Sequence, residues 1–315
     1  MRQLGGKLIR LVIVLFVLSV MAFMSVRLLP GDPAKQIALG SPNFDQKVAE
    51  VRKDLGLDQP LVVQYGRWAG DLVTGDLGKY YHQAGSTPGQ EAAKGLPISM
   101  LLVFYTQVVA LLIAIPLGVI TAHRADKAFD KAANIGAFLA LSIPSFIVGF
   151  LLKKFFAIDH HWLPDSNWVP ITTDVVQHLK HVVLPVTTLV LAQIAVYFRL
   201  LRSDMIATLQ EDFITMAKAK GLKPRRILFR HALRPSSLTL LTVAGLNIGT
   251  LISSSVIVES IFQIKGMGLL LVLGILHRDY VATQSFIVIV GVIFVLVNFM
   301  VDFLYTVIDP RIRYG

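Results

Sequence analysis

Cysteine is absent from the 315 residues of this chain, and charged residues make up only 16% of them. The absence of cysteine excludes disulfide bonds and thiolate chemistry. Soluble domains carry roughly 25% charged residues. The low charge, 54% hydrophobic residues and a mean hydropathy of +0.64 therefore exclude an ordinary soluble protein. The net charge of +10 is confined to a few segments without interleaved aromatic residues, which argues against a nucleic-acid-binding surface.

Several catalytic motifs are missing as well. The sequence has no G-x-x-x-x-G-K-[ST] loop for nucleotide phosphates. The H-E-x-x-H and G-x-S-x-G patterns of metalloproteases and serine hydrolases are also absent. We therefore expect a non-catalytic chain that cannot hydrolyse ATP by itself and that binds no cofactor of its own.

Two adjacent histidines, His160 and His161, lie near Asp159 and Asp165 and raise the possibility of a metal site. Adjacent residues point in different directions on regular structure, and no third ligand stands at a suitable spacing. The stretch 159–170 is more typical of an interfacial loop, because it contains two tryptophans. The sequence therefore predicts no metal site.

Six uncharged apolar stretches predict membrane-spanning helices. They cover residues 11–26, about 96–122, a stretch from about 132, 181–198, 238–258 and 285–301. The first would measure about 24 Å, short of a hydrocarbon core of roughly 30 Å. Arg10 and Arg27 at its ends can snorkel, so the span is long enough. A cleaved signal peptide is the alternative, but no small-x-small cleavage site follows the stretch.

A few polar residues interrupt these spans, namely Gln107, Gln193, Asn247 and Asn298. Such groups either line a translocation path or form hydrogen bonds between helices, and the sequence leaves both open. The substrate-binding residues therefore stay unknown. Gly245 and Gly249, one turn apart, permit close helix contact. Inverted repeats and membrane-buried carboxylates, which an ion-coupled secondary transporter needs, are not evident.

The segment 211–235, EDFITMAKAKGLKPRRILFRHALRP, is the longest strongly charged stretch between two apolar spans. Glu211 and Asp212 suit a helix N-terminus, and Gly221 is a left-handed stop. Pro224 then predicts the start of a second short helix. In the first helix, the spacing places Phe213, Met216 and Ala217 on one face.

The distribution of charge predicts the orientation of the spans. Residues 199–234 hold nine basic and three acidic residues, which places this loop in the cytoplasm. Six spans then put the N-terminus, the loop 123–131, Arg311 and Arg313 on the same side. Segment 30–95, with seven basic and eight acidic residues, is nearly neutral and is expected outside. Lys153 and Lys154 mildly violate this trend.

Residues 212–221 resemble the EAA-type loop of binding-protein-dependent ABC importer permeases. The continuation GLKPRRILFRHALR resembles the dipeptide, oligopeptide and nickel branch of that family. The string LGLDQPLVVQYGRWAGDLVTGDLG, residues 55–78, is similar to the first external loop of that family, and Ile143-Pro144-Ser145-Phe146 resembles another of its signatures. The resemblance extends over nearly the whole chain.

The resemblance implies an all-α integral membrane protein with six transmembrane helices, the type I permease fold of ABC importers and both termini in the cytoplasm. Residues 1–29 then form the first transmembrane helix and 30–95 an extracytoplasmic loop region. Residues 96–315 form a core permease domain, with five transmembrane helices and a cytoplasmic coupling loop at 203–235. In this family the loop docks on an ATPase, which assigns coupling to Glu211, Asp212, Ala217, Lys218, Ala219, Lys220 and Gly221.

The same resemblance implies the partners. These are a second homologous permease subunit, two cytoplasmic ATPase subunits or domains that bind ATP and magnesium, and an extracytoplasmic substrate-binding protein. The expected location is the bilayer of the bacterial inner membrane, without nucleic-acid partners. Peptides are the expected cargo, with nickel chelates or glutathione-like compounds as alternatives. The remaining alternative is that 211–235 is an ordinary basic loop without a coupling role.

Overall fold

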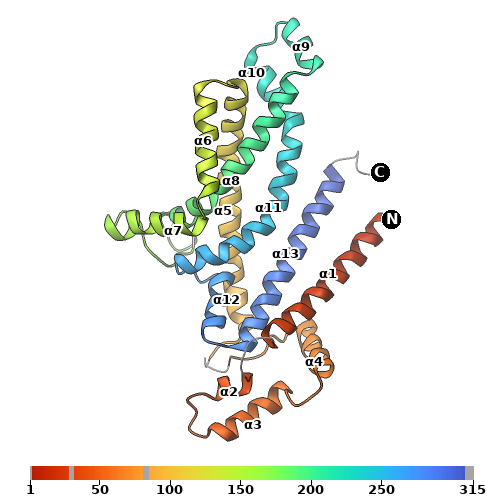
Figure 1. The fold of residues 1–315 in the computed structure, drawn as a ribbon, viewed down its shortest axis with the longest axis vertical. Coiled ribbons are helices and arrows are strands. Elements are labelled where there is room, and N and C mark those ends of the chain that lie inside the picture. The colour runs from red at the N-terminus through yellow and green to blue at the C-terminus, as the bar shows by residue number, and fades with distance from the viewer. Residues whose placement is uncertain (1, 28–31, 81–84, 309–315) are drawn as a thin grey trace. The chain divides into compact units, whose positions relative to one another are not determined.

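The computed structural model describes residues 2–27, 32–80 and 85–308, and these residues form helices and connecting loops without any β-strand (Figure 1). The predictions for 28–29, Arg311 and Arg313 lie outside the described residues. The chain divides into two compact units. The first unit comprises Met1–Ser99 and Lys265–Phe299, and the second comprises Met100–Ile264 and Met300–Gly315.

The first unit combines one long N-terminal helix with short helices and the ends of two further long ones. Its elements are α1 (Arg2–Arg27), α2 (Pro33–Ala38), α3 (Phe44–Leu55), α4 (Leu61–Thr74), the first part of α5 (Pro88–His123), α12 (Met267–Leu276) and most of α13 (Tyr280–Ile308). Segment 30–95 therefore contains the short helices α2, α3 and α4. Asp32 starts α2 by accepting a hydrogen bond from the amide of Ala34, at 3.0 Å. Gly56 and Gly75 end α3 and α4 in the left-handed conformation.

Aromatic side chains hold α4 against α1. The Tyr65 ring meets the rings of Phe16 and Phe23 edge-on, and its hydroxyl lies 2.8 Å from the hydroxyl of Ser19. A second cluster joins α5, α12 and α13 through Ala92, Met267 and Phe286. Segment 30–95 therefore packs on the helices of its own unit and is not a free loop.

The second unit is built around α8 (Val175–Leu209) and α11 (Leu233–Ile261), which pack along each other. Helices α6 (Ala128–Ser142) and α7 (Ser145–Leu152) also pack on α8. Large side chains such as Tyr197 and Leu201 of α8 and Leu240 and Leu251 of α11 are fully buried. Asp174 starts α8 by accepting the amide hydrogen of Gln177, so this helix begins before the predicted 181.

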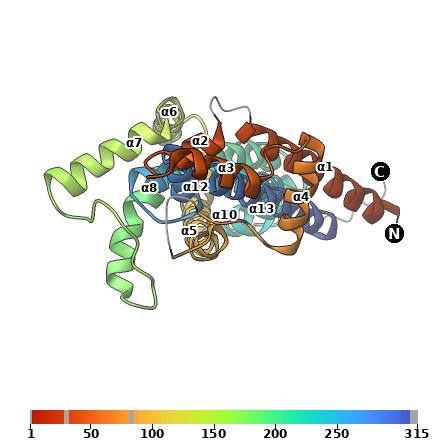
Figure 2. The same cartoon turned by 90° about the horizontal axis from the view of Figure 1, so that it is seen from below.

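By length and hydropathy, five helical stretches among the described residues can each cross a membrane. They are Gly5–Ser25, Pro88–His123, Val175–Leu209, Pro224–Ile261 and Tyr280–Val301. The predicted third span is instead a bent pair, Ala128–Ser142 and Ser145–Asp159, with 95° between its halves. Figures 1 and 2 show α7 leaving the end of α6 at a steep angle. The number of spans is six only if this pair counts as one.

The bend lies where Pro144 follows α6. A proline disfavours the helical conformation of the residue before it, and Ile143 has extended angles, φ −99° and ψ 121°. Helix α6 alone has 15 residues, or about 22 Å. The predicted third span is therefore broken at Pro144, and its second half is α7, which continues into the π-helix η1 (Lys153–Asp159).

The two lysines that violate the charge trend have local partners. The Nζ atom of Lys153 donates a 2.7 Å hydrogen bond to the carbonyl of Ile261, at the C-terminal end of α11. A cation is favourable at that end of a helix. Lys154 forms a salt bridge with Asp159, with a closest distance of 2.9 Å. Both charges are therefore compensated within the second unit.

Three of the four polar residues in the spans form hydrogen bonds between helices. Gln107 of α5 accepts from the hydroxyl of Tyr197, at 3.0 Å, and donates to the carbonyl of Ala244, at 3.2 Å. Asn247 of α11 donates to Gln193 of α8, at 3.2 Å. Asn298 donates only to the carbonyl of Phe294 in its own helix, at 2.9 Å. Gln107, Gln193 and Asn247 therefore connect α5, α8 and α11.

Of the two glycines, Gly245 lies in a close helix contact. A Cβ atom at this position would come within 2.6 Å of the Val301 side chain in α13. Gly249 is buried in the same helix. The close approach predicted from their spacing is therefore present at Gly245.

Candidate functional site

The charged segment that is predicted to couple the permease to an ATPase forms a short helix, α9 (Asp212–Ala219), between α8 and the long helix that follows (Figure 1). Helix α8 ends at Leu209, and Glu211 adopts extended angles, φ −69° and ψ 150°. The Glu211 carbonyl accepts the first helical bond, from the amide of Ile214, at 3.0 Å. Asp212 occupies the first turn, where a negative charge is favourable. The predicted helix start is confirmed.

Gly221 ends this helix in the left-handed conformation, with φ +73°. Its amide bonds the carbonyl of Lys218, at 2.9 Å, and the amide of Leu222 bonds the carbonyl of Ala217, at 3.3 Å. This pair of bonds is the Schellman motif. A Cβ atom at Gly221 would meet no other described residue within 4 Å, so the backbone conformation and not the space requires glycine. The predicted stop is confirmed.

The second short helix predicted from Pro224 is wrong in its length. Pro224 does occupy the first position of α10 (Pro224–Arg226), but α10 continues through the π-helix η2 (Ile227–Ala232) into α11. The resulting stretch, Pro224–Ile261, has 38 residues. In a regular α-helix, the ring of Pro235 would clash with the carbonyl of His231. His231 instead lies in the wider π turn, which ends at Ala232, three residues before Pro235, and the helix continues through the proline.

Helix α9 has one face turned toward its own chain. Ile214 is fully buried and Ala217 is 6% exposed, and α9 packs on η2. The other face is open, because Phe213 is 46% and Met216 is 58% exposed. Phe213, Met216 and Ala217 follow one another at i, i+3 and i+4 along α9, as predicted, but Ala217 lies at the buried edge of this face, next to Ile214. The small side chain of Ala217 allows close approach to η2.

The seven residues predicted for coupling divide in the same way. Ala217 is buried, and the other six are exposed, namely Glu211, Asp212, Lys218, Ala219, Lys220 and Gly221. The resemblance assigned no coupling role to Phe213 and Met216, the two large apolar side chains on the open face. Their spacing of three residues in a charged helix was the available signal.

Basic side chains cover the start of the long helix that follows α9. Arg225, Arg226, Arg230 and Arg234 are exposed, and so is Lys223 before them. None of them forms a salt bridge with a carboxylate among the residues that the structure describes. The open apolar pair on α9 is therefore followed by a positively charged surface.

The helices on both sides of the loop are fixed to the rest of the second unit. Arg202 of α8 donates two hydrogen bonds of 2.5 Å to the carboxylate of Asp130 at the start of α6. This carboxylate also accepts the amide of Asp126 and the side-chain amide of Asn134. Near the end of α8, the hydroxyl of Thr208 lies 2.9 Å from that of Ser236 in α11. The basic loop is therefore mounted on three connected helices.

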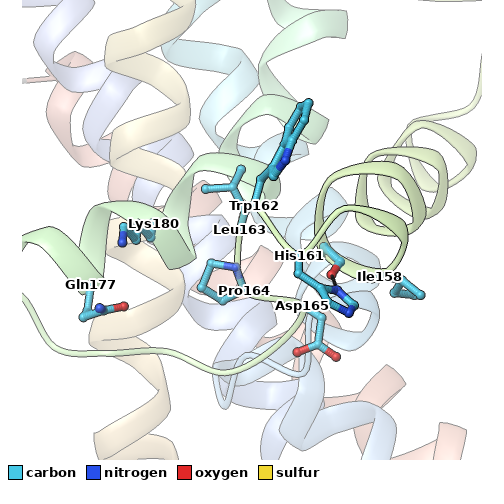
Figure 3. A pocket seen from close by; sticks show the side chains of 9 residues that line it. Ile158, His161, Trp162, Leu163, Pro164, Asp165, Gln177 and Lys180 are labelled. Carbon is cyan, nitrogen blue, oxygen red and sulfur yellow. Dashed lines mark hydrogen bonds between the residues drawn. The ribbon is translucent and has the colours of Figure 1, made fainter.

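The predicted interfacial loop contains a surface hollow of about 560 Å³ (Figure 3). His161, Asp165, Gln177 and Lys180 line it, and all four are exposed. The Nδ1 atom of His161 is hydrogen-bonded to the carbonyl of Ala157, at 2.9 Å. Among the described residues, no three side chains of metal-binding type gather here or elsewhere.

Comparison with known proteins identifies the family. The model of the binding-protein-dependent transport system inner membrane component matches residues 114–314, and that of its N-terminal membrane component matches residues 1–89. The chain is 35% identical over 308 residues to a probable peptide ABC transporter permease, y4tP, of Sinorhizobium fredii, and the match covers 98% of each chain. It is 33% identical to the oligopeptide transport system permease AppB of Bacillus subtilis, over 96% of each chain. It is 35% identical to the glutathione transport system permease GsiC of Escherichia coli, over 98% of this chain and 97% of that one. The chain is therefore a multi-pass membrane protein that belongs to the binding-protein-dependent transport family, the membrane permease subunits of ABC transporters.

Proposed function

We propose that this permease is a subunit of an ATP-driven importer in the bacterial inner membrane, which takes up peptides delivered by an extracytoplasmic binding protein. The names of the relatives AppB and y4tP support peptide cargo. The similarity to GsiC supports a glutathione-like tripeptide as the second candidate. The observation that carries the coupling role is the short helix α9, which is fixed to η2 by one face and exposes Phe213 and Met216 on the other.

The proposed topology has six spans with the basic loop in the cytoplasm. If α6 and the helix after its bend count as one span, successive crossings alternate through the chain. The exposed arginines after Pro224 then face the cytoplasm, together with the N-terminal end of α1 and the turn between α5 and α6. This agrees with the preference of basic loops for the cytoplasmic side.

The proposed docking partner is one of two ATPase subunits, which bind ATP and magnesium. Phe213 and Met216 are the anchors, because large apolar side chains in a pocket carry much of the binding energy of an interface. Full burial of each contributes about 1.5–3 kcal/mol. The exposed residues Lys218 and Lys220 form the rim. A second, related permease completes the translocation pathway.

Two connections would transmit the movement of the ATPase from α9 to the membrane helices. Helix α9, with Ile214 and Ala217 buried, packs on η2, which is continuous with α11. At the other end of the loop, the Arg202–Asp130 pair links α8 to α6. Movement of α9 with the ATPase would therefore shift α6, α8 and α11 and open the pathway to alternate sides.

Reconstitution tests this proposal. The complete complex in proteoliposomes should take up a radiolabelled dipeptide only with ATP and the binding protein present. The double variant F213S/M216S should retain membrane insertion and lose most uptake, while K53Q, an exposed change on α3, should not affect it. Uptake that persists without the ATPase subunits would refute the proposal and support an ion-coupled transporter.

A further inference from the structure

The first unit contains a pocket of about 440 Å³ beside the Arg27 end of α1. Residues of α3, α4 and the Tyr280 end of α13 form its remaining walls. The volume lies within the range of about 300–1,000 Å³ that is typical of small-molecule sites. In the proposed topology this end of α1 faces the outside, where the cargo arrives.

Arg27 lines this pocket and is fixed by neutral groups. Its Nε and Nη2 atoms both donate to the side-chain oxygen of Gln64, at 3.1 and 2.9 Å, and Nη1 donates to the carbonyl of Phe23, at 3.3 Å. The guanidinium carbon lies 3.4 Å from the centre of the Phe23 ring. Gln64 is itself buried, and its amide donates to the carbonyls of Leu57 and Gln59. The arginine is therefore held in place before any ligand arrives.

The charge of Arg27 has no carboxylate partner among the residues that the structure describes. Burial lowers the pKa of its guanidinium to about 10, so the group remains charged at neutral pH in a surrounding that disfavours the charge. Three of its five N–H donors are engaged, and the other two have no partner among the described residues. A planar anion with two acceptor oxygens, such as a carboxylate, complements such a group.

The exposed part of the same pocket carries charges of both signs. Asp54, Asp71 and Asp76 line it, and none of these carboxylates forms a salt bridge with another described residue. Arg67 and Lys79 line it as well. The pocket thus offers a fixed, half-buried cation and, on its exposed side chains, three carboxylates against two cations. This polarity suits a small zwitterion, with its carboxylate inward and its ammonium group outward.

We propose that this pocket binds the carboxyl end of a small peptide, with Arg27, positioned by Gln64, as the ligand of the terminal carboxylate. The inference rests on the proposed function, because a peptide is the expected cargo. It adds a contact between the permease itself and the peptide before translocation. The shared chemistry is a free carboxylate, which a side chain of the binding protein also carries, and the experiment distinguishes the two sources.

Trp68 lines the pocket and provides a direct signal. In the full-length permease with W162F and W168F, it is the only tryptophan, since the chain has three. Purified in nanodiscs without partners, this protein should show a saturable fluorescence change with dialanine. N-acetyl-dialanine, which keeps the carboxylate, should bind within a few-fold of dialanine, because ion pairs of the ammonium group with solvent-exposed carboxylates contribute little. Dialanine amide, which lacks the carboxylate, should bind at least tenfold more weakly.

The variant R27Q should lose at least tenfold in dialanine affinity, and R27K should lose less, because lysine keeps the charge without the planar fork. K53Q on α3, whose residue is exposed and does not line the pocket, is the matched control. The ligand series on the unmodified pocket keeps the test valid even if R27Q folds poorly. Equal affinities for dialanine and its amide would overturn the proposal, as would an unchanged R27Q or a tenfold loss with N-acetyl-dialanine.

One further outcome would assign the pocket to a carboxylate side chain of the binding protein. If dialanine gives no signal and R27Q weakens binding of the binding protein to the complex, the pocket takes a protein side chain and the peptide proposal is wrong. The uptake assay separates this from the proposed function. Binding of dialanine without ATP-driven uptake would refute the importer and leave the pocket, and uptake unaffected by R27Q with no dialanine binding would refute the pocket alone.

Discussion

Replacing Arg202 by methionine should destabilise the permease more than replacing its partner Asp130 by asparagine. The two side chains form one bidentate pair, but they are not equally buried, since Asp130 is 2% and Arg202 is 21% exposed. Loss of the arginine leaves a buried carboxylate with only the Asp126 amide and Asn134 as donors. Loss of the carboxylate charge leaves an arginine that can extend its head group toward water.

The magnitudes follow from this asymmetry. Removing one partner of a buried pair costs about 3–5 kcal/mol when the remaining charge stays buried. We therefore expect R202M to lower the free energy of unfolding by about 3 kcal/mol. For D130N the amide retains part of the hydrogen bonding, and a loss of about 1–2 kcal/mol is expected, as for a hydrogen bond to a charged group. The double variant should be less destabilised than the sum of the two changes, since they remove the same interaction.

Equilibrium unfolding of the purified permease in mixed micelles measures these differences. Arg199 is the matched control, because it is an exposed arginine one turn earlier in α8 without a salt bridge to any described carboxylate. R199M should change the unfolding free energy by less than about 0.5 kcal/mol. If R199M were as damaging as R202M, or if D130N were worse than R202M, the argument from unequal burial would be refuted.

Three further changes test other parts of the structure. G221V should impair ATP-dependent uptake but not membrane insertion, because the left-handed conformation costs about 1–2 kcal/mol for an L-residue and more for a branched one. G221N should retain uptake, and equal uptake by the two variants would contradict this reasoning. G245A should destabilise the fold by about 1–3 kcal/mol, because the new methyl group would clash with Val301. G136A should not destabilise the fold, because no described atom lies within 4 Å of its new Cβ. Thermal unfolding of the two variants measures the difference. Y197F should cost about 1 kcal/mol through the lost hydrogen bond to α5, and an unchanged melting curve would show that this bond contributes no stability.

The local signals in the sequence predicted the local structure of the basic loop. The acidic start and the glycine stop of α9 depend only on neighbouring residues, and both are present at Asp212 and Gly221. Pro144 was visible too, but a proline predicts a bend without its angle. The continuation of α11 back to Pro224 depends on the π turn before Pro235, and sequence periodicity does not distinguish this turn from an α-helical one.

Contacts between residues that are distant in the sequence could not be predicted from the sequence. Asp130 and Arg202 are 72 positions apart, and each looked like an ordinary charge at the edge of a span. The inward face of α9 was also hidden, because it is set by the packing on η2 and not by the helix itself. Likewise, the hydrogen bond of Lys153 to the end of α11 could not be predicted, because it depends on the packing of two distant segments.

On the proposed function, the continuity of α10, η2 and α11 decides how a push on α9 is transmitted. A stretch of 38 residues measures about 57 Å, enough to reach from the cytoplasmic loop through the whole bilayer. Its far end is held by the Lys153 ammonium on the Ile261 carbonyl and by the Asn167 amide on the Phe262 carbonyl. A helix fixed at one end and pushed at the other tilts or bends at its least regular turn. In this helix that turn is η2, on which α9 packs, so the π turn is both the contact of the coupling helix and the expected hinge.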